Sequence, residues 1–120
     1  MVSSYRELIV WQKAMDLVVE TYRAVKSLPK EEMYGLSDQM RRAVVSIPSN
    51  IAEGQSRNST KEFASFLSIA RGSAAELHTQ YLICIRLQYI TEAEAEKALQ
   101  LLEEVGKMLK TLIQKLSDNH

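Results

Sequence analysis

Residues 39–54 read QMRRAVVSIPSNIAEG, and this stretch decides the fold. Apolar residues recur along it every three or four positions, a spacing that places them on one face of a helix. They are Met40, Ala43, Val44, Ile47 and Ile51. Pro48 lies inside this pattern, although an interior proline costs a helix about 3 kcal/mol. The stretch therefore predicts a helix that packing holds in place, with Gly54 as a left-handed closing residue.

The rest of the chain shows the same helical periodicity three more times, with short polar connections between the segments. The predicted helices span residues 5–28, 36–54, 60–87 and 92–116. In the first of them, the side chains predicted to face the core are Leu8, Trp11, Met15, Val18, Tyr22 and Val25. Capping boxes, in which Glu follows a hydroxyl residue by three positions, predict helix starts at Ser59 and Thr91.

Four amphipathic helices of similar length, joined by short loops, are typical of one architecture. Short loops force consecutive helices to run antiparallel, and no alternating strand pattern competes with the helical one. The length of 120 residues suits a single hydrophobic core. We therefore predict an all-α protein with one domain, residues 1–120, folded as an antiparallel up-down-up-down four-helix bundle.

The composition argues against several classes of function. Lys plus Arg and Asp plus Glu both number 15, so no net charge draws the protein to nucleic acid or to a membrane. The apolar fraction of 46% is ordinary for globular proteins, and no run of about 18 apolar residues indicates a membrane span. The first residues do not read as a signal peptide. The sequence therefore predicts a cytoplasmic protein.

Residues suited to catalysis or to metal binding are few. A metal pair inside a bundle needs Glu-x-x-His motifs, whereas Ala75 stands three residues before His78. Cys84, the one cysteine, lies among apolar neighbours and is predicted to be buried. No glycine-rich phosphate loop and no activated serine stand out. We therefore predict no catalytic residues, no cofactor, no metal and no small-molecule substrate, and hence no enzyme.

Polar residues in otherwise apolar helices form one group of candidates. A polar stripe runs beside the apolar face of the second helix, and two charged residues of the third helix lie near its apolar face. The members are Ser46, Asn50, Glu53, Arg71 and Glu76. Because buried charges persist where they are paired, one interpretation is a structural network inside the bundle. The alternative is a polar pocket or a contact between subunits.

Four cations on the second helix and the segment after it form the best basic cluster. They are Arg41, Arg42, Arg57 and Lys61. Phosphate contacts need cations at a suitable spacing, so binding of RNA or DNA through this cluster is one hypothesis. The alternative is a solvated surface that salt bridges hold together. No aromatic residue is interleaved with the cluster, so stacking on bases is not indicated.

Five stretches of the sequence carry a resemblance to a known family. They are residues 5–14 (YRELIVWQKA), 34–43 (YGLSDQMRRA), 46–54 (SIPSNIAEG), 61–63 (KEF) and 72–77 (GSAAEL). Over roughly residues 5–116, the chain resembles bacterial four-helix-bundle proteins of the 23S ribosomal RNA intervening-sequence type. This resemblance implies an antiparallel four-helix bundle that assembles into a ring-like homopentamer.

Two functions remain open on these grounds. The first is a non-enzymatic homo-oligomer that binds nucleic acid through the basic cluster. The second is a protein–protein adaptor or scaffold ring that binds no nucleic acid, and its sign would be an exposed apolar patch. Trp11 and Tyr22 are candidates for contacts between subunits, with core packing as the alternative for each.

Overall fold

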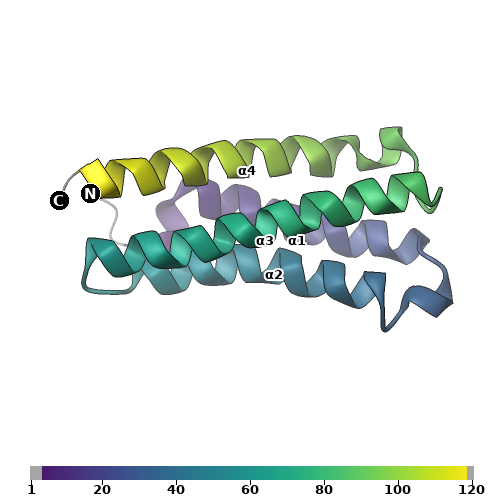
Figure 1. The fold of residues 1–120 in the computed structure, drawn as a ribbon, viewed down its shortest axis with the longest axis horizontal. Helices are drawn as coiled ribbons and strands as arrows, with labels where there is room; N and C mark the ends of the chain where they lie inside the picture. Colours follow the sequence, from purple (N-terminus) through teal and green to yellow (C-terminus); the bar gives the residue numbers. More distant parts are fainter. Residues whose placement is uncertain (1–3, 119–120) are drawn as a thin grey trace.

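The computed structural model describes residues 4–118, and four long helices make up its fold (Figure 1). They are α1 (Ile9–Ala24), α2 (Leu36–Gln55), α3 (Thr60–Arg86) and α4 (Glu92–Asp118). Short 3-10 turns lie outside these helices, at Tyr5–Glu7, Val25–Ser27 and Lys30–Glu32. The part of the chain that the structure describes contains no strand, and the predicted all-α four-helix fold is confirmed.

Each helix packs mainly against two others, so that α1, α2, α3 and α4 follow one another around the bundle. Contacts between α2 and α3 show that these two helices run antiparallel. Ser46 Oγ lies 2.8 Å from Ser73 Oγ, whereas the earlier Met40 contacts the later Cys84. The α1–α2 and α3–α4 connections lie at one end of the bundle, and the α2–α3 connection lies at the other (Figure 1).

The starts of α3 and α4 follow the predicted capping pattern. Ser59 Oγ accepts a hydrogen bond of 3.0 Å from the Glu62 backbone N–H. At the start of α4, the Thr91 hydroxyl accepts from the Glu94 N–H at 3.1 Å, and the Glu94 carboxylate accepts from the Thr91 N–H at 2.8 Å. These bonds satisfy backbone donors that have no partner inside a helix, so they fix where each helix begins.

The buried face of α1 differs from the face that the sequence predicts. Its buried residues are Val10, Ala14, Leu17 and Thr21. Met15 and Tyr22, which the periodicity assigns to the core, are exposed. Val25, just after α1, is buried as predicted, and Leu8, Trp11 and Val18 pack partly buried against the core. The prediction is wrong at Met15 and Tyr22 because α1 carries two apolar stripes side by side, and the buried stripe includes a threonine whose hydroxyl finds a partner. The other stripe stays at the surface.

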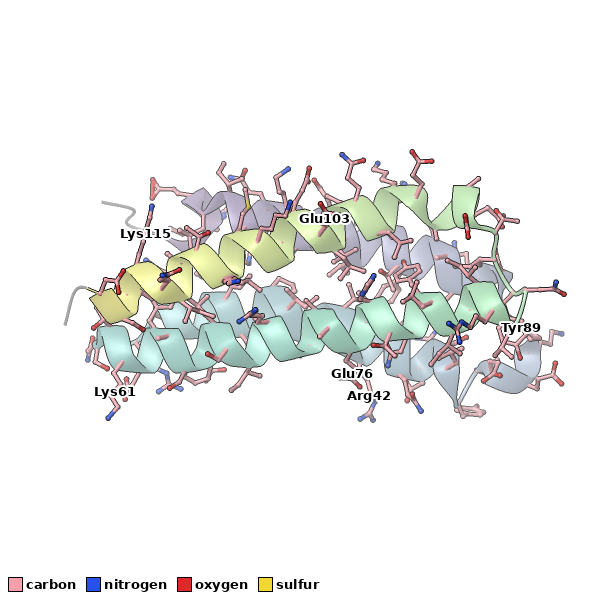
Figure 2. All side chains as sticks on the ribbon, turned by 45° about the horizontal axis from the view of Figure 1, so that its top comes forward. Arg42, Lys61, Glu76, Tyr89, Glu103 and Lys115 are labelled. Carbon is pink, nitrogen blue, oxygen red and sulfur yellow. The ribbon has the colours of Figure 1, made fainter. Side chains whose placement is uncertain are left out.

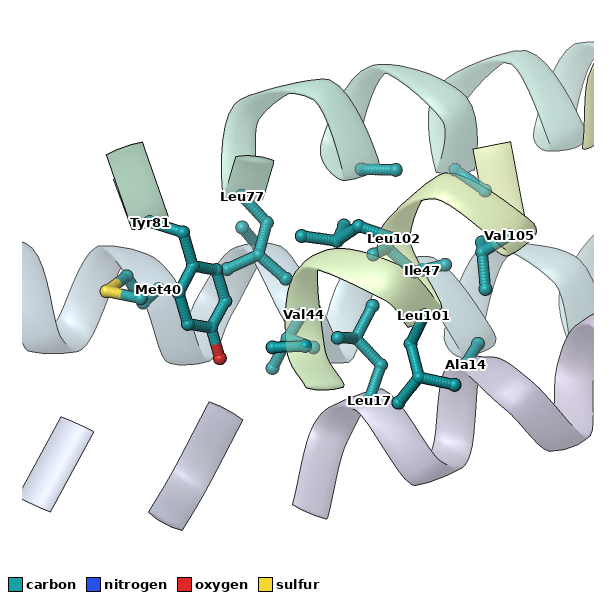
Figure 3. Close-up of a cluster of buried hydrophobic side chains, with 14 of the residues drawn as sticks. Ala14, Leu17, Met40, Val44, Ile47, Leu77, Tyr81, Leu101, Leu102 and Val105 are labelled. Atoms are coloured by element: carbon teal, nitrogen blue, oxygen red, sulfur yellow. The ribbon is translucent and has the colours of Figure 1, made fainter. Parts of the chain in front are cut away.

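A pair of buried hydroxyl groups joins α1 to α3 across the bundle. Thr21 Oγ1 and Tyr81 OH are 2.9 Å apart, and both side chains are fully buried. Burial raises the pKa of Tyr81 to about 12, so the phenol stays protonated at neutral pH. Figure 3 shows Tyr81 among the buried apolar side chains, with Leu77 and Met40 beside it. The pair gives a polar group inside the core its required partner.

The sequence also predicts a left-handed Gly54 at the end of α2, and this prediction is wrong. No described glycine has a positive φ, and α2 continues to Gln55. A Cβ atom on Gly54 would lie 2.7 Å from Phe66 Cβ and 3.0 Å from Phe63 Cδ1. Gly54 therefore serves the close approach of α2 to α3. Pro48 is buried inside α2, which continues through it as the sequence predicts.

Candidate functional site

Exposed apolar side chains gather on the side of the bundle formed by α1 and α2. Met15, Val19 and Tyr22 follow one another along α1 at intervals of four and three, so they form one stripe. Their exposed fractions are 41%, 50% and 42%. Val45 of α2 is 40% exposed and borders the same hollow as Tyr22. These four side chains are called the α1–α2 surface below.

The hollow beside Tyr22 and Val45 has a volume of about 430 Å³. Its other lining residues are Asp38, Arg41, Arg42 and Ser46. Arg42 Nε lies 3.2 Å from Asp38 Oδ2, so these two charges are paired. Arg41 has no carboxylate partner among residues 4–118 and donates a long hydrogen bond of 3.4 Å to a backbone carbonyl. The hollow therefore holds one uncompensated positive charge next to apolar side chains.

The four cations that the sequence groups as one basic cluster lie in two separate places. Arg42 belongs to the first half of α2, and Arg57 follows about 15 residues later, or roughly 22 Å along a helix. Figure 2 shows Arg42 well apart from Lys61. Arg57 also pairs with Glu53 at 2.7 Å and lies over the Phe66 ring at 4.9 Å. Arg42 and Arg57 thus form ion pairs within the chain, and the four cations do not form a continuous patch.

The hydroxyl and amide members of the predicted polar group do form a network. Ser46 Oγ lies 2.8 Å from Ser73 Oγ, and Asn50 Nδ2 donates to Ser46 Oγ at 2.9 Å. Asn50 Nδ2 also lies 2.8 Å from the Ser46 carbonyl oxygen, which it can reach as a second acceptor. These half-buried groups join α2 to α3. Ser73 is the member that the sequence reasoning missed.

The charged members of that group lie outside the bundle interior. Glu53, Arg71 and Glu76 are exposed, and Glu53 is paired at the surface with Arg57. Neither Arg71 nor Glu76 forms an ion pair within residues 4–118. The prediction of a buried network among these three charges is wrong, because each lies beyond the edge of the buried face of its helix. Their role as contacts between subunits stays a prediction.

A second stripe with exposed apolar residues runs along α3. Ile69 and Ile83 are 52% and 40% exposed. Gly72 and Glu76 lie between the two isoleucines in the sequence. The four residues are separated by three, four and seven positions, which are helical repeats, so they share one stripe. A Cβ atom on Gly72 would meet nothing within 4 Å, which shows that the stripe is open there. Ile69, Gly72, Glu76 and Ile83 are called the α3 ridge below.

Another hollow lies between α3 and α4 and has a volume of about 860 Å³. Its lining residues are Thr79, Leu82, Ile83, Ile85, Arg86, Glu92, Ala93, Glu96 and Leu99. A second hollow of about 430 Å³ shares Leu99 and is bordered by Arg71, Lys107 and Lys110. Lys107 pairs with Glu103 at 3.2 Å. Sequence reasoning missed this group of cations because only the packing of α3 on α4 brings them together.

Metal-binding groups and the one cysteine are the remaining features that the sequence analysis considered. No group of three or more His, Cys, Asp or Glu side chains within residues 4–118 could hold a metal ion. Cys84 is buried, as the sequence predicts, and burial raises the pKa of its thiol to about 11. The thiol is therefore protonated at neutral pH and a poor nucleophile.

None of the helices within residues 4–118 combines the length and the apolar character that crossing a lipid bilayer requires. This finding concerns the described helices alone.

Comparisons with known proteins point to one family. A family profile described as "23S rRNA-intervening sequence protein" matches residues 6–111. The chain is also similar to a crystal structure of a protein of unknown function from the S23 ribosomal protein family of Bacteroides thetaiotaomicron. The two are 27% identical with a TM-score of 0.79, over 88% of this chain and 98% of that chain. None of the curated proteins matches the sequence.

Proposed function

Because the chain belongs to the 23S rRNA-intervening sequence protein family, we propose that it is a non-catalytic protein that works as a self-associating scaffold. The observation that carries this proposal is the α1–α2 surface, where four large apolar side chains remain exposed in the single chain. Covering apolar area is favourable by about 25 cal/mol per Å². Contiguous exposed apolar side chains are typical of surfaces that bind other proteins.

The expected assembly is a homo-oligomer. A second copy of the chain is always present at the same concentration as the first, so it is the simplest partner for an apolar surface. We propose five subunits, because the sequence resembles proteins that form a ring-like homopentamer. One chain has a mass of 13.6 kDa, so the assembly should be five times as heavy.

A Val19→Glu variant is expected to fall from the oligomer mass to that of one chain. Val19 is 50% exposed in the single chain, so the charge should leave the helical fold intact while it opposes burial between copies. Size-exclusion chromatography with light scattering measures the mass, and circular dichroism checks the helices. Leu87→Glu is the matched control, because Leu87 is 51% exposed but lies at the end of α3. A wild-type protein that stays monomeric at tens of micromolar would contradict self-association.

A second candidate function is nucleic-acid binding, and a specific observation favours it. Arg71 and Lys110 border the same hollow as Lys107, and neither of the first two forms an ion pair within residues 4–118. Lys61 and Lys115 both lie toward the end of the bundle that holds the α2–α3 connection (Figure 2). Unpaired cations at the surface are able to contact phosphates. Repetition around an oligomer would strengthen weak contacts, because several copies could bind one strand at once.

The test is retention of RNA and DNA oligonucleotides on a filter as a function of salt. An Arg71→Glu, Lys110→Glu double variant is expected to lose at least tenfold in affinity and to show a weaker salt dependence. A Lys26→Glu, Lys30→Glu variant is the matched control, since it changes the net charge equally at exposed lysines outside this hollow. Equal retention by both variants, or none by the wild type at low salt, would rule this candidate out.

A further inference from the structure

We propose that the α3 ridge of one copy docks into the hollow of the α1–α2 surface of a second copy, with Glu76 of the ridge facing Arg41 of the hollow. This inference rests on the self-association proposed above and names the two surfaces that meet. Three observations support it: the exposed apolar side chains of the surfaces, their charges and their places on the bundle.

Both surfaces expose apolar side chains. The hollow of about 430 Å³ has Tyr22 and Val45 in its lining. Ile69 and Ile83 project from α3 at two places along the ridge, 52% and 40% exposed. Packing a row of side chains on one helix into a groove beside another is the usual way in which helices pack. Contact along the ridge would therefore cover apolar side chains of both copies.

The charges of the two surfaces are complementary as well. Glu76 lies on the ridge between the two isoleucines and has no cationic partner within residues 4–118. Arg41 lines the hollow and has no carboxylate partner there, whereas Arg42 is paired with Asp38. A guanidinium and a carboxylate form a strong, directional pair. Contact between the surfaces would pair Arg41 with Glu76 as both side chains lose their hydration.

The places of the two surfaces determine the kind of assembly. The ridge lies on α3 and the hollow lies between α1 and α2, so the two surfaces consist of different residues. They are neighbours on one side of the bundle, because Ser46 of the hollow lies 2.8 Å from Ser73, which is next to the ridge on α3. A contact between unlike surfaces leaves one ridge and one hollow free in every pair, and copies continue to add until a ring closes. A side of the bundle measures roughly 46 by 20 Å. This area is enough for a stable interface, which typically buries about 800 Å² of accessible surface on each partner.

A nucleic acid is the other class of molecule that would suit the hollow, because Arg41 and Arg42 both line it. The surroundings favour a protein surface instead. A phosphate would satisfy Arg41 but would leave Tyr22 and Val45 exposed. It would also leave Glu76 without a partner. A second copy satisfies the charges and the apolar side chains together.

Charge reversal tests the proposed pair. Arg41→Glu and Glu76→Arg are each expected to weaken association at least tenfold, so that both variants sediment as single chains at concentrations where the wild type is assembled. The double variant is expected to regain the wild-type mass, because the pair is re-formed in the opposite order. Glu96→Arg, at an exposed glutamate of α4, is the matched control and should retain the wild-type mass.

Mixing two defective variants tests whether unlike surfaces meet. Val19→Glu damages the α1–α2 surface and leaves the ridge intact, whereas Ile69→Glu damages the ridge and leaves the hollow intact. Each variant alone should be a single chain with wild-type circular dichroism. Their mixture should form a complex of two chains and no larger species, because one ridge and one hollow remain usable.

The outcomes separate this inference from the proposed function. A monomeric wild type would overturn both. An assembled wild type would overturn the docking proposal alone if Arg41→Glu and Glu76→Arg keep its mass, or if the mixture stays monomeric. If Arg41→Glu keeps the oligomer but no longer retains RNA on a filter, the occupant of the hollow is a nucleic acid and the docking proposal is wrong.

Discussion

A Tyr81→Ala variant is expected to lose about 3–5 kcal/mol of its free energy of unfolding, the cost typical of truncating a large buried aromatic side chain. The Tyr81 ring is completely buried, and alanine would leave a cavity in its place. The truncation would also leave the buried Thr21 hydroxyl without its partner at 2.9 Å. Urea denaturation followed by circular dichroism measures the change. Protein concentration must be held constant, because association of folded copies adds to apparent stability.

Controls for this prediction separate the ring from the hydroxyl pair. Tyr34→Ala should change stability by no more than about 0.5 kcal/mol, because Tyr34 is 91% exposed. Thr21→Val and Tyr81→Phe should each cost about 1–3 kcal/mol, since each leaves a buried hydroxyl unpaired. The double variant Thr21→Val, Tyr81→Phe should lose less free energy of unfolding than the sum of the two single losses, because it leaves no buried hydroxyl unpaired. A loss below about 1 kcal/mol in Tyr81→Ala would show that the core closes over the cavity.

A Gly54→Ala variant is expected to lose about 1–3 kcal/mol, although alanine favours helices more than glycine does. The added methyl group would meet Phe66 Cβ at 2.7 Å and the Phe63 carbonyl oxygen at 3.2 Å. Neither atom is the free end of a flexible side chain, so α2 and α3 would have to move apart. Thermal and urea unfolding of the variant measure this cost.

Gly106→Ala is the matched control for that substitution. It lies inside α4, and a Cβ atom there would meet nothing within 4 Å. The same change should therefore stabilise the protein by about 0.5–1 kcal/mol, because alanine restricts the unfolded chain and favours the helix. Opposite signs at the two glycines would confirm that close packing accounts for Gly54. A Gly54→Ala variant as stable as the wild type would contradict it.

Most of the fold follows from the helical periodicity of the sequence. The predicted core residues of α2, from Met40 to Ile51, are all buried, because a single apolar stripe leaves one possible face. The sequence is ambiguous in α1, where two apolar stripes lie about one residue apart. Which stripe faces the core depends on partners in α3, since Thr21 is tolerated inside only with the Tyr81 hydroxyl nearby. That partnership joins residues that are 60 positions apart.

The candidate surfaces are also hard to predict from the sequence, because they too depend on contacts between distant parts of the chain. From the sequence, Tyr22 is a candidate for either a subunit contact or core packing, and its 42% exposure in the single chain excludes core packing. The four cations of the basic cluster do not form one patch. Arg41 and Arg42 lie in the first half of α2, whereas Arg57 and Lys61 follow its far end, so a short separation in sequence becomes a long distance in space. The cations Arg71 and Lys110 meet only through helix packing, so no local spacing marks them.

The short connections of the bundle set the order of events after synthesis. Three of the four packed helix pairs are consecutive in the chain, and only α1 with α4 joins distant segments. Helical proteins with such local contacts fold within microseconds to milliseconds. Copies at about 1 µM need roughly 0.1–10 s to meet at ordinary association rates. Chains would therefore encounter one another as finished bundles, and exchange of whole helices between copies would have little opportunity to compete.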